Sequence, residues 1–356
     1  MEKAMIAMSG GVDSSVAALL TKEKGFECVG VTMKLFQNED AGIPREKACC
    51  SVDDIEDARR ICYRIGMPHY VFNFTEEFRE EVMERFVDAY KNGITPNPCI
   101  DCNRYMKFRH LFRRMQETGG TYLITGHYAR VRQDEQTGRF LLLKGADESK
   151  DQSYVLYNLT QEQLAHVQFP LGELRKDQVR SIAEDHGFIN AGKHDSQDIC
   201  FVPDGDYTAF IERYTGEMAK PGDFVDKEGK VLGRHEGITH YTIGQRRGLR
   251  FPAKTRIYVQ KIDPVTNQVV LGKNEDLFTT ELTANELNLI TCDKLTEPLR
   301  VTAKVRYRHK EQPALAWQTE DGKLHVRFDQ PQRAITRGQA VVLYQGDLVI
   351  GGGVIE

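Results

Sequence analysis

The sequence predicts an α/β protein in which a doubly wound parallel sheet is followed by a small β-rich central domain and a C-terminal β-barrel. Between residues 3 and about 130, short apolar runs alternate with stretches of helical periodicity, which favours βαβ units. A glycine-rich turn follows the first apolar run, at the position where such sheets bind ligands. After about residue 205, helical patterns give way to short β patterns separated by Asp, Gly and Asn turns.

Each element of the α/β part is predicted from its own apolar pattern. Apolar runs predict strands at 4–8, 27–35, 69–73 and 122–125. Helical patterns open at 16–20 and cover 51–66, 75–92, 154–167 and 176–186, and residues 139–144 are expected to close a hairpin. The helix at 75–92 has one apolar stripe, formed by Phe78, Val82, Phe86 and Tyr90. The polar stretch 36–50 is long enough to be a functional flap.

The β half contains three hairpin patterns. They pair 257–262 with 269–271, Trp317 with 324–328, and 341–344 with 348–350. We therefore expect three domains, at residues 1–205, 206–275 and 276–356, with the first carrying the catalytic site.

Composition limits the classes of protein that fit. A chain of 356 residues is long enough for two or three domains. It has no apolar run of membrane-spanning length and no N-terminal signal pattern, so we expect a soluble, cytoplasmic protein without a membrane partner. The net charge of -4 argues against a generally basic nucleic-acid-binding surface but allows a local one. In such a chain, the eight cysteines are expected to be buried, catalytic or metal-binding rather than a disulfide framework.

The stretch from Ala7 to Ser15 carries the strongest local signal. A strand, a glycine turn and a helix N-terminus form a phosphate site, because free backbone N–H groups and the helix dipole both favour an anion. Asp13 suggests Mg²⁺ bridging to phosphate oxygens. No Gly-Lys-Ser/Thr follows, so this is not a Walker loop. It resembles the SGGxDS loop of the ATP pyrophosphatases, which split ATP to AMP and pyrophosphate. The alternative is a turn without a ligand.

Two further motifs contain cysteines. In residues 95–103, two prolines are expected to hold Cys99 and Cys102 on an irregular loop ahead of a helix that carries Lys107. Nearby cations and a helix N-terminus would lower the pKa of these thiols. A lone Cys-x-x-Cys is compatible with a redox dithiol, half a zinc site or a cluster. In residues 194–201, Cys200 is expected in a polar loop, where inert packing is the alternative.

Taken together, the motifs resemble those of the tRNA-specific 2-thiouridylases over essentially the whole chain. The matching segments are SGGVDSS at 9–15, GHY at 126–128, KDQSY at 150–154, DICF at 198–201 and GQRRGL at 244–249. The resemblance implies an ATP-pyrophosphatase fold and a sulfurtransferase that uses ATP and Mg²⁺. Such enzymes adenylate the wobble uridine of tRNA at C2 and then replace that oxygen with sulfur.

The resemblance also implies site residues. Cys102 matches the nucleophile and Cys200 the cysteine that carries a persulfide. Its terminal sulfur attacks C2 directly, or Cys102 forms a disulfide with Cys200 and releases sulfide. Residues implied to bind ATP are Ala7, Met8, Ser9, Gly10, Gly11, Val12, Asp13, Ser14, Met33 and Gly126. Residues implied to contact tRNA are Asn97, Pro98, Cys99, His127, Lys150, Asp151, Gln152, Arg306, Tyr307 and Gln339.

The family further implies tRNAs of the Lys, Glu and Gln type, and a sulfur donor such as a cysteine desulfurase or a sulfur-relay protein. The target base must be flipped out of its stack to react. One position departs from the family, because many members carry Asp where this chain has Cys99. An alternative is therefore that Cys99, Cys102 and Cys200 ligate a [4Fe–4S] cluster, which would change the sulfur-transfer step.

The β half offers cations for RNA contact. In residues 301–308, apolar side chains alternate with Thr302, Lys304, Arg306 and Arg308, which predicts a strand with one cationic face, although a merely solvated face fits as well.

Two rival functions share the glycine loop. One is a ligase of the argininosuccinate or GMP synthetase kind acting on a small molecule, which needs no paired cysteines. The other is an RNA-binding module that senses ATP without turnover.

Overall fold

The computed structural model describes residues 1–37, 52–193, 199–250 and 256–356, which form two compact units. Unit 1 comprises residues 1–82, 99–206 and 347–349, and unit 2 comprises residues 83–98, 207–346 and 350–356. Most of the expected flap at 36–50 and the start of the cysteine motif at 194–198 lie outside the described residues.

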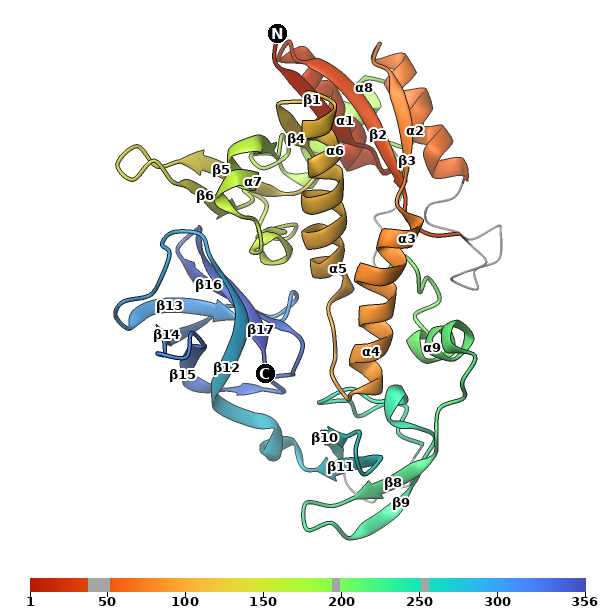
Figure 1. Ribbon diagram of the computed structural model, residues 1–356, viewed down its shortest axis with the longest axis vertical. Helices are drawn as coiled ribbons and strands as arrows, with labels where there is room; N and C mark the ends of the chain where they lie inside the picture. The colour runs from red at the N-terminus through yellow and green to blue at the C-terminus, as the bar shows by residue number, and fades with distance from the viewer. Residues whose placement is uncertain (38–51, 194–198, 251–255) are drawn as a thin grey trace. The chain divides into compact units, whose positions relative to one another are not determined.

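Unit 1 is built on a five-stranded sheet of order β3-β2-β1-β4-β7 (Figure 1). Every pairing in this sheet is parallel. The strands are β1 Lys3–Ala7, β2 Glu27–Lys34, β3 His69–Asn73, β4 Tyr122–Ile124 and β7 Val167–Gln168. Strand order runs outward from β1 in both directions, which confirms the predicted doubly wound parallel sheet.

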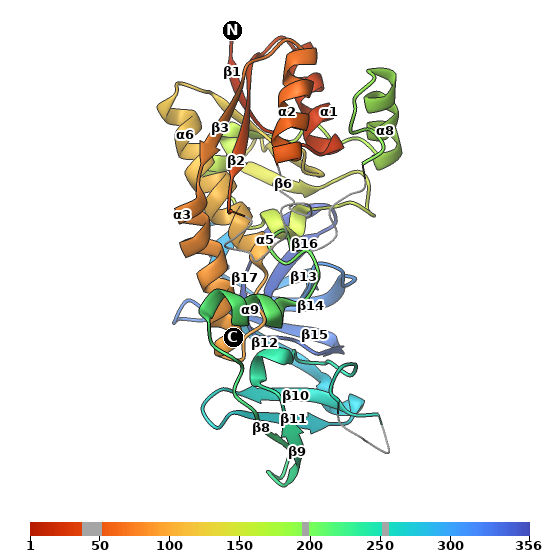
Figure 2. The same ribbon diagram turned by 90° about the vertical axis from the view of Figure 1, so that its right-hand side faces the viewer.

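Helices cover both faces of this sheet. Figure 2 shows α1, α2 and α8 on one side of the strands and α6 on the other. The helices of unit 1 and those leading out of it are α1 Val12–Glu23, α2 Val52–Arg64, α3 Thr75–Phe78, η1 Arg79–Glu84, α4 Arg85–Lys91, α5 Pro98–Asp101, η2 Cys102–Leu111, α6 Phe112–Glu117, η3 Ser153–Leu156, α7 Gln161–His166 and α8 Lys176–Asp185. The predicted stripe Phe78, Val82, Phe86 and Tyr90 is buried throughout. Cys28 and Cys62 belong to the core beneath α1 and α2.

The expected helix at 154–167 is interrupted. Residues Ser153–Leu156 form a 3-10 turn, and α7 begins only at Gln161. The break follows from local chemistry, because Thr160 caps α7 in a reciprocal capping box with Gln163. The expected hairpin is confirmed, with β5 Ala129–Gln133 paired antiparallel to β6 Phe140–Lys144.

Unit 2 contains helix α9, Tyr207–Thr215, which the sequence patterns did not predict. Two β structures follow this helix. A four-stranded sheet of order β10-β11-β8-β9 uses β8 Gly222–Val225, β9 Val231–His235, β10 Tyr258–Asp263 and β11 Gln268–Gly272. The second structure uses β12 Phe278–Leu289, β13 Leu299–Lys304, β14 Gln312–Gln318, β15 Leu324–Arg333, β16 Ala340–Gln345 and β17 Leu348–Ile355. β12 pairs with both β15 and β17, which closes a barrel as predicted. The boundaries at 205 and 275 stay a prediction.

The predicted strand at 301–308 is too long. β13 ends at Lys304, and a turn follows in which the His309 N–H donates to the Arg306 carbonyl at 3.1 Å. The Arg306 guanidinium is half-buried and donates to the carbonyls of Ile243 and Ala334. This cation therefore holds unit 2 backbone together and does not belong to a row of outward-facing cations on a strand.

Within the described ranges, no helix is both long enough and apolar enough to cross a membrane.

Gly30 in β2 provides a test of the packing between the sheet and α2. A Cβ atom there would lie 2.5 Å from the Cys62 Sγ and 2.9 Å from the Met67 Cε. We expect Gly30→Ala to lower the free energy of unfolding by about 1–3 kcal/mol, because the core is overpacked. Thermal unfolding measures this, with Gly192→Ala as the control, since a Cβ at Gly192 meets nothing within 4 Å. Adding Cys62→Ala should recover part of the loss, and equal stability of both single variants would contradict the packing.

Candidate active site

The glycine loop joins β1 to α1 at the carboxyl edge of the sheet. Ala7 ends β1 and Val12 begins α1. Because Ala7 pairs with Val31 and Ile6 with Ile124, both Met33 and Gly126 lie at the same edge as the loop. The fold thus gathers at one edge all the positions predicted to bind ATP. The side chains of Met8 and Val12 are buried in the core, so these two residues offer only backbone atoms to a ligand.

Hydrogen bonds and a close backbone contact fix the loop. Gly10 has φ +75°, and a Cβ atom there would lie 2.5 Å from the Asp54 carbonyl oxygen on α2. Only glycine fits this conformation and this contact. The buried Asn190 donates from Nδ2 to the Gly10 carbonyl and to the Ser15 hydroxyl, both at 2.9 Å. Among the described residues, no side chain caps the N-terminus of α1, which leaves its first N–H groups available to an anion.

Gly126 packs directly on the loop from β4. A Cβ atom at Gly126 would lie 2.8 Å from the Asp13 carbonyl carbon and 2.8 Å from the Ser14 nitrogen. Both atoms are backbone, so a larger residue would displace the start of α1. This contact gives a physical reason for glycine at a position that the sequence assigned to ATP binding only by resemblance.

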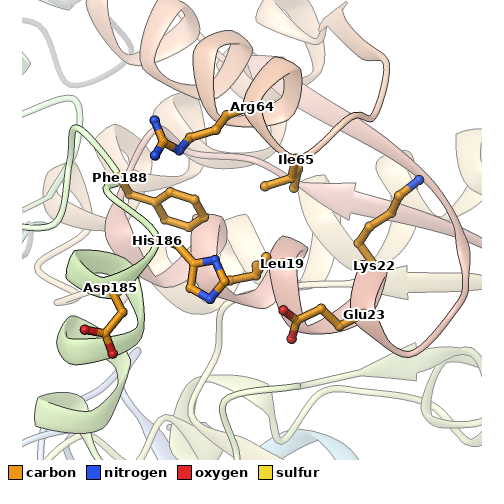
Figure 3. A pocket seen from close by; sticks show the side chains of 8 residues that line it. All are labelled: Leu19, Lys22, Glu23, Arg64, Ile65, Asp185, His186 and Phe188. Carbon is orange, nitrogen blue, oxygen red and sulfur yellow. The ribbon is translucent and has the colours of Figure 1, made fainter.

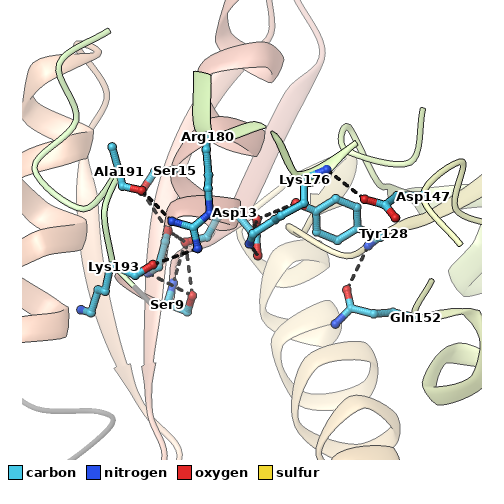
Figure 4. A network of polar contacts seen from close by, with 12 residues as sticks. Ser9, Asp13, Ser15, Tyr128, Asp147, Gln152, Lys176, Arg180, Ala191 and Lys193 are labelled. Carbon is cyan, nitrogen blue, oxygen red and sulfur yellow. Dashed lines mark hydrogen bonds and ion pairs between the residues drawn. The ribbon is translucent and has the colours of Figure 1, made fainter. Parts of the chain in front are cut away.

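The Asp13 carboxylate is held in a charged network (Figure 4). Lys176 Nζ contacts both Asp13 oxygens at 2.8 Å, and the Tyr128 hydroxyl donates to Oδ1 at 2.8 Å. The Lys176 side chain is only 11% exposed, which strengthens the ion pair relative to a surface one. In this structure Lys176 therefore forms an ion pair with the Asp13 carboxylate, which the sequence predicted to face Mg²⁺ and phosphate.

The same network reaches the segment that contains Lys150, Asp151 and Gln152. Asp147 Oδ2 accepts from the Lys176 backbone N–H at 3.0 Å, and Gln152 pairs with Tyr128 through Oε1 and its own backbone N–H. The Asp151 carboxylate accepts from Ser153 and from the Gly145 N–H. Asp151 and Gln152, predicted to contact tRNA, thus also hold the backbone beside Tyr128 in place.

The second motif begins a helix instead of preceding one. The irregular stretch ends at Asn97, and α5 starts at Pro98, a position where proline fits because it needs no N–H partner. Cys99 therefore lies on the first turn with its side chain exposed, and the half-buried Cys102 begins the π-helical segment η2. The expectation that both cysteines lie on a loop is wrong, because Pro98 serves as the first helical residue.

The π geometry of η2 affects where Lys107 lies. In a π-helix the hydrogen bonds join residues five apart, so residues 102 and 107 are neighbours on successive turns. The Lys107 Nζ is 3.4 Å from His127 Nε2, and Thr125 Oγ1 is 2.7 Å from His127 Nδ1. Burial first, and then Lys107, hold the pKa of His127 well below 6.5, so the ring is neutral. Since an ammonium only donates, His127 accepts at Nε2 and carries its proton on Nδ1.

The electrostatics of Cys102 differ from the prediction. Burial raises the pKa of the Cys102 thiol to about 11, although Lys107 acts to lower it. The predicted lowering by nearby cations is wrong in its net effect, because desolvation of the thiolate outweighs the attraction of one ammonium group. Cys102 is consequently a protonated thiol at neutral pH in this structure.

Cys200 lies in a turn anchored to the same part of unit 1. The Val202 N–H donates to the Ile199 carbonyl at 2.8 Å, and Phe201 packs edge-on against Phe78 of α3 at 5.7 Å between ring centroids. The neighbouring Phe74 ring lies 6.2 Å from that of His110 in η2. The Cys200 turn and the Cys102 helix therefore pack around one structural element, although they are far apart in sequence.

Two of the positions predicted to contact tRNA have structural contacts within unit 2. Gln339 donates from Nε2 to the carbonyls of Thr95 and Pro96, at 2.9 and 3.1 Å. It thereby fixes the backbone that leads into Asn97 and Pro98. Tyr307 is exposed beside Lys304, whose Nζ lies 5.7 Å from the ring centroid, so a stacking surface is available there.

No three His, Cys, Asp or Glu side chains gather in a metal-binding arrangement within the described part of the chain. Cys99, Cys102 and Cys200 are all described, so they do not form a preformed ligand set for an iron–sulfur cluster. Asp13 does fit a role toward Mg²⁺, because that ion commonly takes one or two protein carboxylates together with substrate phosphates.

A pocket of about 490 Å³ lies at the opposite end of α1 from the glycine loop (Figure 3). Its lining residues are Leu19, Lys22, Glu23, Arg64, Ile65, Asp185, His186 and Phe188. Both basic and acidic side chains line this pocket, and none of the predicted site residues is among them.

Sequence patterns missed the roles of Lys176 and Asn190, which approach the glycine loop from more than 160 positions away. Lys176 opens a predicted helix, at whose N-terminus a lysine opposes the helix dipole, and this mismatch is the one local signal available. Asn190 offers no such signal.

The raised pKa of Cys102 predicts slow alkylation in the substrate-free protein. At pH 8, a pKa of about 11 instead of 9.0 lowers the thiolate fraction about 100-fold. We expect the rate of Cys102 alkylation by iodoacetamide, followed by peptide mass spectrometry, to rise until about pH 11. Lys107→Met should slow the reaction at pH 8, while the exposed Arg113→Met should not. A midpoint at or below pH 9, or no effect of Lys107, would contradict this electrostatic account.

Family models cover nearly the whole chain. They match a tRNA methyl transferase HUP domain at residues 2–204, a tRNA methyl transferase PRC-barrel domain at 208–273 and an aminomethyltransferase beta-barrel domain at 279–355. The chain is 50% identical to tRNA-specific 2-thiouridylase MnmA of Clostridium acetobutylicum, over 100% of this chain and 99% of that protein. It is also 50% identical to MnmA of Clostridioides difficile, over 100% and 98%. Identity to MnmA 1 of Thermoanaerobacter pseudethanolicus is 52%, over 99% and 98%. The chain therefore belongs to the tRNA-specific 2-thiouridylase family, as its motifs predicted.

Proposed function

We propose that this chain uses ATP to replace the C2 oxygen of the wobble uridine of tRNA with sulfur. The observation that carries the proposal is the tripeptide Gly126-His127-Tyr128. Gly126 packs on the glycine loop, His127 contacts Lys107 of the Cys102 helix, and the Tyr128 hydroxyl binds Asp13. Three consecutive residues thus touch both a phosphate-binding loop and a cysteine helix, which supports one reaction that uses nucleotide and thiol together.

The first step in this proposal is adenylation of the base. A uridine C2 oxygen is a poor leaving group, and its transfer to the α-phosphate of ATP converts it into AMP, which leaves readily. The uncapped N-terminus of α1 offers backbone N–H groups to the phosphates. Lys176, which contacts the Asp13 carboxylate in this structure, would pair with the phosphate instead, and Asp13 would then hold Mg²⁺. When bound, Mg²⁺ supplies neutralisation of the phosphate charge.

The second step is sulfur transfer, for which we propose Cys200 as the persulfide carrier and Cys102 as the nucleophile. In one route the terminal sulfur of the Cys200 persulfide attacks C2 and AMP leaves, after which Cys102 attacks the Cys200 sulfur, forms a disulfide with it and frees the 2-thiouridine. In the other route Cys102 attacks the inner sulfur first, forms the same disulfide and releases sulfide, which then attacks C2 as AMP leaves. In the second route the Cys102 proton must leave, and Lys107 is the cation positioned to stabilise the resulting thiolate. The alternative that Cys99, Cys102 and Cys200 ligate an iron–sulfur cluster stays a prediction.

For tRNA recognition, we propose that Asn97, Pro98, Cys99, His127 and Lys150 face the substrate. Asp151, Gln152 and Gln339 support the backbone beside these residues through the hydrogen bonds described above. In the barrel, Tyr307 offers an exposed ring for stacking, whereas Arg306 acts by holding its turn. By family resemblance, the substrates are tRNAs of the Lys, Glu and Gln type, sulfur comes from a desulfurase or relay protein, and the reaction takes place in the cytoplasm.

The reaction itself is the first test. Anaerobic protein is mixed with unmodified tRNA, Mg-ATP and a sulfide or persulfide source, and the nucleosides are analysed by mass spectrometry. We expect 2-thiouridine to form only when ATP is present. Cys102→Ser and Cys200→Ser should reduce its formation at least about 100-fold, because each removes a reacting sulfur. Cys292→Ser, a half-buried cysteine of unit 2, is the matched control.

The rival functions give different results in the same assay. Full turnover of a small substrate by Cys200→Ser would favour a ligase of the synthetase kind. Tight tRNA binding without release of pyrophosphate would favour an ATP-sensing RNA-binding module. Iron and acid-labile sulfide in the active, anaerobically purified protein would favour an iron–sulfur cluster held by Cys99, Cys102 and Cys200.

Lys176 is expected to matter for adenylation rather than for sulfur transfer. Lys176→Met removes the cation next to Asp13 and should slow pyrophosphate release from ATP and tRNA about 100-fold, since fixed charges at developing negative charge contribute on that order. Lys22→Met, at the other end of α1, is the control. Pyrophosphate release at the wild-type rate with Lys176→Met would exclude this role.

A further inference from the structure

A turn in unit 2, the GQRRG turn, begins at Gly244 and ends at Gly248. Both glycines have a positive φ, +83° and +76°, which is a backbone conformation that favours glycine. Gln245 accepts the Thr242 N–H through Oε1 at 2.9 Å and donates from Nε2 to the Arg247 carbonyl at 3.0 Å. One glutamine side chain therefore fixes the backbone of this turn from inside.

Two arginines of the barrel hold the same turn through its backbone carbonyls. Arg306 donates to the Ile243 carbonyl at 3.4 Å, and Arg333 donates to the Gly244 carbonyl at 3.3 Å. A Cβ atom at Gly244 would lie 2.9 Å from the Cβ of Ala334, whose own φ is +53°. A residue other than glycine keeps such a φ only where the surrounding contacts determine it. The barrel thus provides a rigid support for the turn.

The side chains of Arg246 and Arg247 take no part in this support. Both are exposed, and within the described part of the chain neither guanidinium forms a hydrogen bond or an ion pair. The nearby Arg250, by contrast, donates to Glu236 at 2.7 Å. A structural role accounts for the glycines and the glutamine of the turn but gives no task to these two charges. Because the backbone is already fixed, both guanidinium groups can bind an anion without first ordering a loop.

A second turn, after β13, adds cations beside the first. Residues 304–311 contain four basic residues and one acidic residue, Glu311. Burial first, and then Arg306 and two further cations, lower the pKa of His309, so the charges that act on this ring are all positive. Because Arg306 also binds the Ile243 carbonyl, the two turns meet at one arginine and present one positive surface.

We propose that Arg246 and Arg247 bind phosphate groups of the tRNA backbone. A guanidinium group suits a phosphate, because it donates two parallel hydrogen bonds to two oxygens. RNA is favoured over an acidic protein because Tyr307, in the second turn, is exposed and offers a ring on which a base can stack. This role rests on the proposed function, in which tRNA is the substrate, and it extends the tRNA contacts to the PRC-barrel domain at residues 208–273.

The test measures the binding of unmodified tRNA at several salt concentrations. Arg246→Ala/Arg247→Ala should weaken binding at least about tenfold at about 0.1 M salt, because two phosphate contacts are lost. It should also reduce the slope of log affinity against log salt concentration by about 1.4–1.8. Since phosphate contacts do not read the bases, the loss should be equal for tRNAs of the Lys, Glu and Gln type. At saturating tRNA, 2-thiouridine should form at the wild-type rate.

The matched control is Arg59→Ala/Arg60→Ala. These exposed arginines of α2 form ion pairs with Glu56, and their removal changes the net charge by the same amount. The control should bind tRNA as wild type does. Arg246→Lys/Arg247→Lys keeps both charges and should keep the salt slope, while the loss of the two-pronged contact lowers affinity. Thermal unfolding checks that every variant is folded.

A variant of the glutamine separates the charge of the turn from its shape. Gln245→Ala removes both hydrogen bonds that fix the turn but leaves the two arginines. We expect weaker tRNA binding with an unchanged salt slope, because the same phosphates are contacted at a greater cost in ordering.

Several results would overturn the role of the two arginines. They are an unchanged affinity and salt slope in Arg246→Ala/Arg247→Ala, an equal loss in the control, or a loss confined to one tRNA. If wild type still forms the thionucleoside, any of these leaves the proposed function standing. If wild type binds tRNA with the expected dependence on Arg246 and Arg247 but forms no thionucleoside, the proposed reaction is wrong and the phosphate contact stands.

Discussion

The contact between Gly126 and the backbone of Asp13 and Ser14 is the constraint on which the site depends. It sets the distance between β4 and the start of α1, and therefore where the first N–H groups of α1 point. This contact also fixes the positions of the residues that follow Gly126. His127 reaches Lys107 and Tyr128 reaches Asp13 because the chain leaves β4 at this one point. One close backbone contact thus aligns the start of α1, after the glycine loop, with the cysteine helix.

The Lys176–Asp13 ion pair neutralises the charge at the start of α1. A half-buried carboxylate without a partner would destabilise the start of α1, and a half-buried ammonium without one would be equally costly. Each neutralises the other in this structure, and in the proposed reaction a bound phosphate would take over the lysine and leave the carboxylate to a metal ion. Asp147, which accepts from the Lys176 backbone N–H, keeps the lysine at the loop during such an exchange.

Sequence patterns predicted the elements whose signals are local. The glycine loop, the parallel strands and the β hairpins each lie within a few consecutive residues, and the structure contains them. Lys176 and Asn190 could not be found in this way, because only the fold brings them to Gly10 and Asp13. The π geometry of η2 has no sequence signal either. The direction of the pKa shift at Cys102 depends on whether burial of the thiol, which raises the pKa, outweighs the attraction of Lys107, which lowers it. A sequence motif does not show how deeply a residue is buried.

The surroundings of Lys107 bear on how Cys102, a thiol with a high pKa, would act as the nucleophile proposed above. Within the described ranges, Lys107 forms no ion pair with a carboxylate, and its partner is the neutral His127 ring. Its charge is therefore not cancelled and continues to favour a thiolate at Cys102. Burial suppresses that thiolate in the substrate-free protein, which protects Cys102 from solvent oxidants. In the proposed reaction, Lys107 is therefore the group that stabilises the Cys102 thiolate when this thiol attacks the persulfide.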